Sequence, residues 1–481
     1  MNYRFALRVI GNVLKYETLL LFIPLLVTLI YRENPIGFIA TILISGLASL
    51  ILCRIKIDKQ QMYAKEGFIT VGIAWIMISV VGALPFVIDG SIPSFVDAFF
   101  ETVSGFTTTG ATILTEVESL PKGILFWRSF THWIGGMGIL IFMLALIPSL
   151  GSSTIHLIKA ESPGPNPGKI VTKLKETANI LYIIYFLLTI VQTILLVMAG
   201  LPLYDSLITA LGTAGTGGFS NMNASIGAYH NSAVDWIVTV FMIIFGINFA
   251  LYYQVLKGNI KNALRNEELK FYALIIVSAI ALISFNIYDF YGRNLGETIR
   301  LSSFQVASIV TSTGYATADF NLWPSVSRTI IVFLMLVGAM AGSTGGGIKT
   351  IRVVIMLKAI KREINKILHP KRIQSVKIDG KVVGEETISG VFLFIGAYTI
   401  IALIAMFILS FDGFDLVTTS TSVITTLSNI GPGLNLVGPT GNFSIYSSFS
   451  KIVLSFCMLA GRLEIYPMLI LFSPSLWRKN Y

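Results

Sequence analysis

Thr108-Thr109-Gly110-Ala111-Thr112 is a short run of small residues between two apolar segments, and it decides the fold. Similar runs follow at three later positions: Gly215-Thr216-Gly217-Gly218-Phe219, Ser312-Thr313-Gly314-Tyr315-Ala316 and Asn429-Ile430-Gly431-Pro432-Gly433. Their central glycines, at positions 110, 217, 314 and 431, are 107, 97 and 117 residues apart. Because this period is close to a quarter of the chain, the pattern predicts four copies of one structural unit around a central pore.

The composition is that of an integral membrane protein. Of the 481 residues, 54% are hydrophobic and 12% are charged, and the mean hydropathy is +0.77, whereas soluble domains carry about 25% charged residues. A helix needs about 20 apolar residues to cross a bilayer. Ten candidate spans are found: residues 10–31, 36–53, 68–88, 124–150, 178–201, 233–256, 271–290, 329–358 (interrupted), 388–411 and 448–472. We therefore expect an all-α integral membrane protein.

Each of the four pseudo-symmetric units is expected to follow an M1-P-M2 arrangement: an outer span, a short descending helix, the loop and an inner span. The short helices are predicted at residues 94–104, 204–211, 297–310 and 414–427. The expected domains are residues 1–67, an extra N-terminal pair of transmembrane helices, and pore units at 68–158, 159–257, 258–360 and 361–481. Ordinary turns between transporter helices are an alternative for any single loop, but not for four at matching positions.

Basic residues indicate the orientation, because Lys and Arg are enriched in cytoplasmic loops. They gather before the repeats: Arg54, Lys56, Lys59 and Lys65; Lys159, Lys169, Lys173 and Lys175; Lys257, Lys261, Arg265 and Lys270; and the run from Arg352 to Lys381. With ten spans all four groups lie on one face, which predicts a multi-pass protein with both termini cytoplasmic. The net charge of +10 is then a topology signal, so membrane lipid and not nucleic acid is the expected partner.

The four loops have the chemistry of an ion filter. Irregular backbone at membrane depth is tolerated only where it lines a water-filled cavity or is buried in protein, and rings of backbone carbonyls can replace the hydration shell of a cation. Glycine helps because it adopts dihedral angles that other residues avoid. The candidate filter residues are Thr108, Thr109, Gly110, Ala111, Gly215, Thr216, Gly217, Gly218, Ser312, Thr313, Gly314, Tyr315, Asn429, Ile430, Gly431 and Pro432.

A glycine-rich break interrupts the inner span of the third unit between Gly338 and Lys349. It holds five glycines in twelve residues, and each costs a helix about 1 kcal/mol relative to alanine. A movable barrier below the filter is expected here, with Gly342, Ser343, Thr344, Gly345, Gly346, Gly347 and Lys349 as candidate gate residues. The alternative is that the glycines permit close helix packing.

Arg462 is the remaining gate candidate, because it lies within the last apolar span. A charge at this depth costs about 3 kcal/mol on insertion scales and usually has a function. We expect Arg462 to face the cavity, where it would impede cations; a structural salt bridge to another helix is the alternative. Lys451 is expected to snorkel to the outer interface. The same interface is expected to hold Trp127, Arg128, His132 and Trp133.

The loops, together with Gly342-Ser343-Thr344-Gly345-Gly346-Gly347-Ile348-Lys349-Thr350 and Ala460-Gly461-Arg462-Leu463-Glu464, closely resemble the TrkH/TrkG/KtrB superfamily of potassium uptake proteins. The extra N-terminal pair and the length resemble the TrkH branch. The resemblance implies a K⁺-translocating subunit of a bacterial or archaeal inner membrane, a homodimer gated by a cytoplasmic TrkA-like RCK ring. NAD or ATP/ADP would bind to that partner, and no cofactor is expected in this chain.

The resemblance also implies roles for particular residues. The glycine-rich break would be the intramembrane gate, and Arg462 the arginine that faces it. K⁺ would be held at Thr108, Thr109, Gly215, Thr216, Ser312, Thr313, Asn429 and Ile430. Only the central glycine is shared with the TVGYG filters of fourfold potassium channels, so we expect a less stringent filter that passes K⁺ and Rb⁺ with some Na⁺ leak.

Three classes of function were compared. A K⁺-permeable pore with a movable barrier is favoured. An Na⁺- or H⁺-coupled symporter with alternating access would normally show intramembrane carboxylates, and Glu464 is the main exception in nearly carboxylate-free spans. A membrane enzyme would need a catalytic cluster. The four histidines, His132, His156, His230 and His369, have no metal-like spacing, and no nucleophile or nucleotide motif is found.

Overall fold

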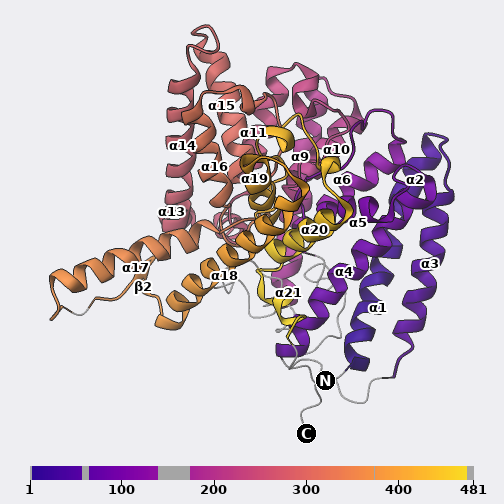
Figure 1. Cartoon of the computed structure of the whole chain (residues 1–481), viewed down its shortest axis with the longest axis horizontal. Helices are drawn as coiled ribbons and strands as arrows, with labels where there is room; N and C mark the ends of the chain where they lie inside the picture. Colours follow the sequence, from indigo (N-terminus) through magenta and orange to yellow (C-terminus); the bar gives the residue numbers. More distant parts are fainter. Residues whose placement is uncertain (1–2, 57–63, 139–173, 373, 474–481) are drawn as a thin grey trace.

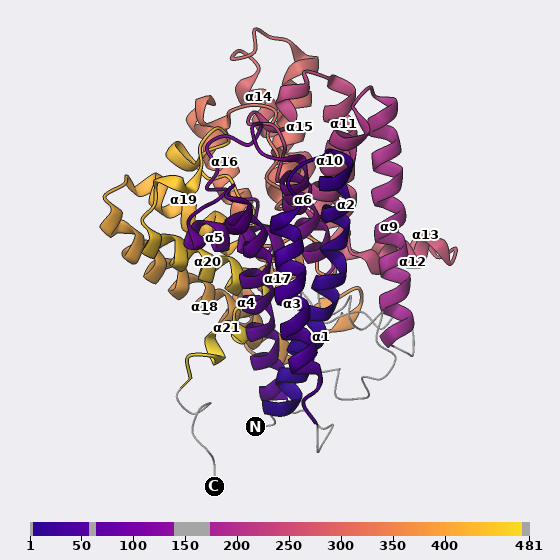
Figure 2. The ribbon, with the colours of Figure 1, turned by 90° about the vertical axis from the view of Figure 1, so that its right-hand side faces the viewer.

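The computed structural model describes residues 3–56, 64–138, 174–372 and 374–473, and it is mostly helical (Figure 1). The N-terminal segment forms three helices, α1 (Tyr3–Leu20), α2 (Phe22–Ile30) and α3 (Ile36–Cys53). Helices α1 and α2 continue one another across Leu21 and form one span, and α3 returns beside α1 (Figure 2). Both α1 and α3 pack against α4 (Ala64–Asp89), the first helix of the next segment. The expected extra helix pair is therefore present.

Four short helices, here called the pore helices, each lie between an outer and an inner helix. They are α5 (Phe95–Phe106), α10 (Leu203–Gly215), α15 (Leu295–Val310) and α19 (Leu416–Leu427). The outer helices are α4, α9 (Leu174–Met198), α14 (Glu267–Ile287) and α18 (Glu385–Leu409). The inner helices begin as α6 (Lys122–Gly136), α11 (Ser232–Phe245), α16 (Ser325–Leu336) and α20 (Ser448–Arg462).

Within the described residues, the inner helices of the second, third and fourth units are broken rather than continuous. Helix α11 continues as α12 (Phe249–Leu256) after a bend of 91°. Helix α16 is followed by the glycine-rich segment and then by α17 (Thr350–Leu368), and α20 is followed by α21 (Tyr466–Ile470). Helix α6 ends at Gly136, and the rest of the span expected at 124–150 lies beyond the described residues. The prediction of a break in the third unit alone was therefore incomplete.

The number of full-length spans is smaller than expected for the same reason. Among the described residues, six helical segments are long and apolar enough to cross a membrane, or seven if the bent pair α11 and α12 counts as one span. The ten apolar runs of the sequence include inner segments that are divided by a break. The expected basic residues at positions 59, 159, 169 and 173 lie outside the described residues.

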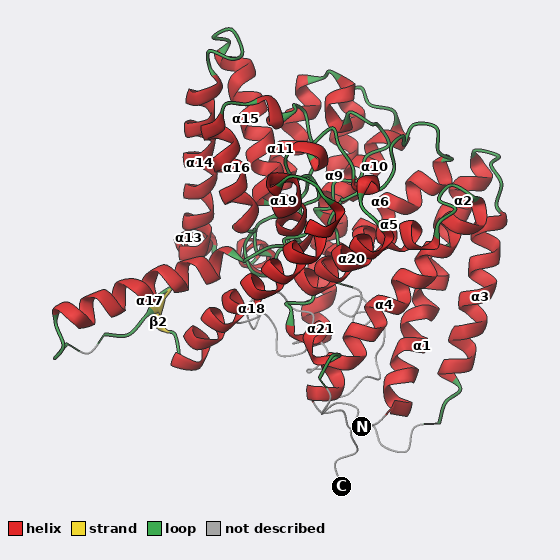
Figure 3. Ribbon diagram, viewed as in Figure 1, coloured by secondary structure: helices red, strands yellow, loops and turns green. Residues whose placement is uncertain are grey.

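Contacts between neighbouring units close a ring. Each pore helix contacts the outer and inner helices of its own unit. It also contacts the inner helix of the preceding unit: α10 contacts α6, α15 contacts α11 and α19 contacts α16. Helix α5 of the first unit contacts α20 of the fourth, so the order is cyclic. Loop segments gather at the centre of this arrangement (Figure 3).

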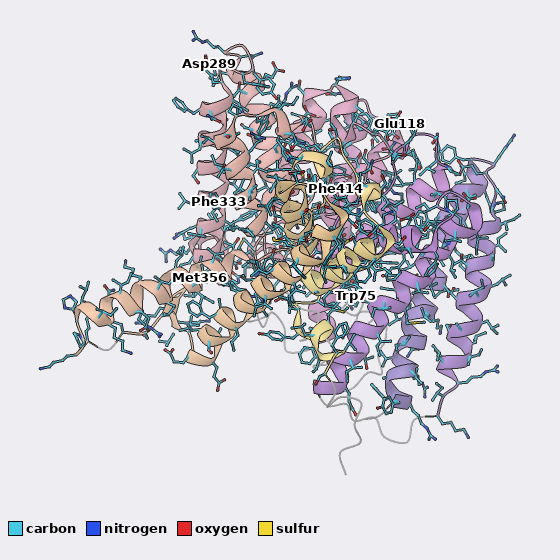
Figure 4. The ribbon with its side chains drawn as sticks, viewed as in Figure 1. Trp75, Glu118, Asp289, Phe333, Met356 and Phe414 are labelled. Atoms are coloured by element: carbon cyan, nitrogen blue, oxygen red, sulfur yellow. The ribbon has the colours of Figure 1, made fainter. Side chains whose placement is uncertain are left out.

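Pore helices rich in Ser and Thr remain stable in the interior because their hydroxyl groups bond to their own backbone. In α19, the hydroxyls of Thr421, Ser422 and Thr425 donate to carbonyls four residues earlier, at 2.7, 2.7 and 2.8 Å. Such bonds satisfy buried polar groups locally. The outer surface is apolar by contrast: Phe333 on α16 is 65% exposed, whereas Trp75 on α4 is 1% exposed (Figure 4).

The remaining elements are short. They are the helix α13 (Ile260–Arg265), the antiparallel strands β1 (Lys377–Ile378) and β2 (Lys381–Val382), and the 3-10 turns η1 (Ser225–Tyr229), η2 (Phe320–Leu322), η3 (Ser410–Asp412), η4 (Asn435–Val437) and η5 (Phe443–Ile445). The strands form a hairpin between α17 and α18 that projects from the helical body on the side where α21 lies (Figure 1). We call this the lower side.

Candidate ion pore and gate

The four predicted loops meet in cyclic order. A methyl group built on Gly110 would lie 2.0 Å from the carbonyl oxygen of Gly217, and one on Gly218 would lie 2.0 Å from that of Thr313. A methyl group built on Gly314 would lie 2.2 Å from Ile430 O, and one built on Gly431 would lie 2.7 Å from Thr109 O. Each filter glycine thus abuts the carbonyl oxygen that precedes the glycine of the next loop. This contact order leaves no room for a side chain at the four glycine positions.

The backbone of the four loops repeats in detail. Each pore helix ends in a non-glycine residue with a left-handed conformation, φ 53–57°: Thr108, Thr216, Ser312 and Asn429. Two residues later each loop has a glycine with positive φ: Gly110, Gly218, Gly314 and Gly431. The residue between them donates its N–H to the carbonyl five residues earlier, at 2.8–2.9 Å in all four loops, as in a Schellman helix end.

This repeat corrects the register of the second loop. Its central glycine is Gly218 and not Gly217, so the spacings of the equivalent glycines become 108, 96 and 117. The sequence is ambiguous here because it offers Gly215, Gly217 and Gly218 within four residues. The left-handed residue Thr216 settles the alignment, since left-handed conformations are uncommon outside glycine and cluster at functional sites.

Side chains join the fourth loop to the first. The Asn429 amide Nδ2 donates to Thr109 Oγ1 at 3.0 Å and to Met458 O at 2.9 Å. Thr109 Oγ1 in turn lies 2.8 Å from Thr107 Oγ1. These bonds lie at the junction where the last unit of the chain meets the first. They hold together two loops that are 320 residues apart in sequence.

A buried ion pair supports the first two loops. Arg128 Nη2 lies 2.7 Å from Glu101 Oε1, and the two side chains are 2% and 0% exposed. Arg128 Nη1 donates to Ser220 O at 3.1 Å, just after the second loop. The other oxygen, Glu101 Oε2, accepts the N–H of Ile113 at 3.0 Å, just after the first. Because both charges are paired and hydrogen-bonded, the pair can persist in the interior.

His132 makes a second link between the same loops. Its Nδ1 lies 2.8 Å from Gly105 O, in the last turn of α5, and its Nε2 accepts the N–H of Phe219 at 3.2 Å. A neutral imidazole with its proton on Nδ1 satisfies both bonds. Gly217 packs directly on the ring, since a methyl group there would lie 2.2 Å from His132 Cγ. His132 therefore fixes the second loop relative to the first pore helix.

The expectation that Arg128, His132 and Trp127 lie at the outer membrane interface was wrong. All three are buried, and the Trp127 indole donates to Gly82 O at 3.0 Å. The two tryptophans suggested an aromatic belt, whereas the useful signal was the four-residue spacing of Arg128 and His132, which places two polar groups on one helix face. The expectation for Lys451 was also wrong. Its Nζ lies 2.6 Å from Asp97 Oδ1, and its side chain is 9% exposed.

The glycine-rich segment between α16 and α17 folds back on itself. Gly338 N donates to Ile348 O at 2.8 Å and Thr350 N donates to Ala339 O at 3.1 Å, so the two ends of the segment lie side by side. The middle of the segment touches the loops: Gly346 N donates to Ser312 Oγ, and a methyl group on Gly346 would lie 2.5 Å from Ser428 O. The segment is thus packed directly beneath the third and fourth loops.

Arg462 holds this segment from the opposite side. Its Nη1 donates to Thr344 O at 2.8 Å, and its Nη2 donates to Gly136 O at 2.8 Å and to Gly135 O. The guanidinium therefore links the segment to the end of α6, across the ring. Lys349 Nζ donates within the segment to Gly345 O. Glu464 forms an ion pair with Arg352 of α17.

Two cavities lie on opposite sides of the loops. One of about 130 Å³ is lined by Gly110, Gly218, Gly314 and Gly431 and by the segments that follow them. The other, of about 100 Å³, is lined by the end of α6, the glycine-rich segment and the breaks after α11 and α20, and its residues include Gly136, Phe249, Gly346 and Arg462. Arg462 thus faces a cavity, as expected. The loops and the glycine-rich segment separate the two cavities.

No group of three or more His, Cys, Asp or Glu side chains that could hold a metal ion occurs within the described residues. The loops offer backbone carbonyls and hydroxyls, which are possible ligands of a monovalent cation. Fold and site together define a class: a multi-pass membrane transport protein in which four loops from one chain meet on a common axis.

The comparisons name the family. The chain matches the TrkH family, described as a cation transport protein, over residues 32–479, and it belongs to this family. It is 34% identical over 489 residues to the Trk system potassium uptake protein TrkH of Salmonella typhimurium, with 100% of both chains covered. It is 34% identical over 460 residues to TrkG of Escherichia coli, covering 95% of this chain and 94% of that protein.

A solved structure supports the same assignment. The crystal structure of the potassium transporter TrkH from Vibrio parahaemolyticus matches with a TM-score of 0.89 and 30% identity, covering 99% of this chain and 100% of that one. The predictions of family, of an all-helical membrane fold and of a transport protein rather than an enzyme are confirmed by these relationships.

Proposed function

We propose that this protein takes up K⁺ through a channel-like pore whose filter is the ring of four loops. The observation that carries the proposal is the cyclic contact of Gly110, Gly218, Gly314 and Gly431 with the carbonyls of the neighbouring loops. Such a ring can offer several oxygens at once to a dehydrated cation. The potassium uptake proteins among its relatives support K⁺ as the transported ion.

The oxygens that hold K⁺ are assigned to the filter backbone and its hydroxyl groups. The assigned residues are Thr108, Thr109, Gly215, Thr216, Ser312, Thr313, Asn429 and Ile430. The carbonyls of Gly217 and of its equivalents in the other loops join this set, because they adjoin the filter glycines. With only one glycine shared by all four loops, the cage is less constrained than a TVGYG filter, so K⁺ and Rb⁺ pass with some Na⁺ leak.

The glycine-rich segment from Gly342 to Lys349 serves as the gate, and Arg462 stabilises its closed position. The bonds from Arg462 to Thr344 O and Gly136 O support this role, because they join the segment to the opposite unit. Opening the pore requires these bonds and the bond between Gly346 N and Ser312 Oγ to break. A backbone with this many glycines can rearrange at modest cost.

A TrkA-like RCK ring, which carries NAD or ATP/ADP, controls the gate from the cytoplasmic face, and the protein works as a homodimer. The lower side is assigned to the cytoplasm of a cell with this protein in its inner membrane, with both termini inside. Lys257, just after α12, and the basic residues of α13 and α17 support this assignment. The projecting α17 and the β1–β2 hairpin offer the most accessible docking surface (Figure 1).

Coupled transport is the second candidate, and buried carboxyl groups favour it. The spans contain more of them than the sequence suggested, because Glu17, Glu101 and Glu268 are each at most 5% exposed. Neither carboxyl oxygen of Glu17 has a hydrogen-bond partner among the described residues, which makes the burial of this group costly. Glu101 and Glu268 are bonded within the fold.

Uptake of labelled Rb⁺ into cells that lack their own potassium systems distinguishes the two candidates. The pore predicts uptake that follows the Rb⁺ electrochemical gradient and is indifferent to imposed Na⁺ or pH gradients. Uptake that is driven uphill by either gradient would favour the symporter. Reversal potentials in a planar bilayer measure selectivity in the same protein, and K⁺ over Na⁺ selectivity as strict as that of a tetrameric potassium channel would contradict the predicted leak.

A further inference from the structure

Glu268 lies outside the filter and yet contacts both ends of the gate segment. It belongs to the first turn of α14 and is 5% exposed. Its Oε1 accepts the N–H of Ala341 at 2.7 Å and the N–H of Ile351 at 3.1 Å. These two residues flank the segment from Gly342 to Lys349. One carboxylate oxygen therefore fastens the beginning and the end of the gate to the same point.

The N-terminus of α17 explains why a carboxylate is placed there. The first N–H groups of a helix have no partner within the helix and favour negative charge. Lys349, the residue before α17, provides no side-chain bond to them. Glu268 supplies the missing acceptor from another helix. It thus caps α17 and at the same time holds the chain that enters the gate at Ala341.

The two residues before Glu268, Asn266 and Glu267, connect the start of α14 to the β1–β2 hairpin. Glu267 N donates to Asp379 Oδ1 at 2.8 Å, and Asn266 Nδ2 donates to Asp379 Oδ2 at 2.8 Å. Asp379 forms the turn between β1 and β2. Glu267 also forms an ion pair with Lys358 of α17. The start of α14 is therefore bonded on one side to the hairpin and on the other side to the gate.

We propose that Glu268 is a positioning residue that holds the gate segment closed, and that the start of α14 transmits displacements of the β1–β2 hairpin to it. The proposal rests on the proposed gating role of the segment. The bonds of Glu268 to Ala341 and Ile351 are observed whether or not the segment is a gate. If the hairpin is pulled away, Asp379 draws on Asn266 and Glu267, and Glu268 loses its hold on Ala341 and Ile351. A partner that grips the hairpin then acts on the pore without touching it.

The first test measures where the segment is, independently of ion flux. Ser343, which is 6% exposed, is replaced by cysteine in a chain whose two cysteines are replaced (Cys53→Ser, Cys457→Ala), and its reaction with a water-soluble maleimide is timed in proteoliposomes. Glu268→Ala is expected to raise the rate about tenfold, the effect of losing hydrogen bonds to a charged group. Glu268→Gln retains an acceptor oxygen and should stay close to the parent. Equal rates for Glu268→Ala and the parent would overturn the positioning role.

Asp379→Gly tests the link to the hairpin, because it removes the carboxylate at this exposed position while glycine accepts the positive φ of 49°. It should raise the labelling rate of Ser343→Cys in the parent and have no further effect when combined with Glu268→Ala, because the two act in series. Additive effects would overturn the transmission. Rb⁺ flux through the same proteins distinguishes the positioning role of Glu268 from the gating role of the segment. Faster labelling of Glu268→Ala without faster flux would support the positioning role and contradict the gating role.

Discussion

At the scale of single residues, the geometry of the four loops depends on side chains that lie behind them. His132 joins Gly105 O to the N–H of Phe219, and Arg128 joins Glu101 to Ser220 O. These bonds fix the second loop relative to the first pore helix from behind. Buried polar groups with every partner present make a structure rigid, whereas a single missing partner is costly. The first two loops are therefore held in one geometry.

Removing the imidazole should reduce selectivity before it reduces folding. In His132→Ala both the acceptor for Phe219 N–H and the donor for Gly105 O are lost, which costs about 1–3 kcal/mol of stability. The second loop becomes mobile, so the K⁺ over Na⁺ permeability ratio from reversal potentials should fall several-fold. His369→Ala, at an exposed histidine with φ −135°, is the matched control and should leave the ratio unchanged. An unaltered ratio in His132→Ala would show that the loop is held by other contacts.

At the scale of elements, the loops and the glycine-rich segment form two layers. The pore helices end in the same left-handed turn four times, and the segment packs beneath the third and fourth of these turns. The upper layer is fixed by tight glycine contacts. The lower layer is held by separate hydrogen bonds to several elements, among them bonds with Arg462, Glu268 and Ser312. We expect the segment to move more readily than the four loops.

Alanine at a filter glycine should abolish selective uptake. At Gly314 the new methyl group would lie 2.2 Å from Ile430 O, and φ is 82°, a conformation that alanine adopts only at a cost. The neighbouring loop must move, so the carbonyl ring opens. The measurement is Rb⁺ uptake in competition with Na⁺. Gly390→Ala on α18 is the control, since nothing lies within 4 Å of the new methyl group there. Retained selectivity in Gly314→Ala would argue against the carbonyl ring.

Shortening the glycine-rich segment should leave the protein folded and make it leak. Deletion of Gly342–Gly347 removes the backbone that lies against Ser312 and Ser428, but it leaves the helix packing around the ring. Rb⁺ efflux from proteoliposomes without any partner should therefore increase several-fold over the full chain. Circular dichroism and gel filtration establish that the shortened protein is folded. Unchanged efflux from folded protein would remove the gating role from this segment.

The periodicity of the sequence predicted the elements better than it predicted their breaks. Five clustered glycines in the sequence predicted the break between α16 and α17. The bend after α11 has one glycine, Gly246, and depends on Asn248, whose side chain caps α12. The turn after α20 depends on Glu464 and Ile465 with positive φ. These breaks depend on tertiary contacts, so the local amino-acid composition does not predict them.

The sequence predicted only in part which residues lie together at the candidate site. A loop of the same kind in every quarter of the chain implied a common centre, and the loops do meet there. The register of the second loop was missed because three of its residues are glycine. Glu268 was missed because nothing near it in sequence suggests that it reaches across to Ala341 and Ile351.

At the scale of the whole molecule, the ring is not symmetric in its supports. The first two units carry the buried links of Glu101, Arg128 and His132, whereas the glycine-rich segment contacts the third and fourth loops and the break between α11 and α12. The N-terminal pair α1 and α3 packs against α4 and so reinforces the first unit further.

The central claim is that the four loops bind a dehydrated monovalent cation on their common axis. Anomalous diffraction from crystals grown with Rb⁺ in place of K⁺ tests it most directly. We predict a peak bounded by the carbonyl oxygens of Thr109, Gly217, Thr313 and Ile430, which weakens when Na⁺ replaces Rb⁺. Ordered loops without a peak between them, or a peak bound by side chains elsewhere in the described chain, would contradict it.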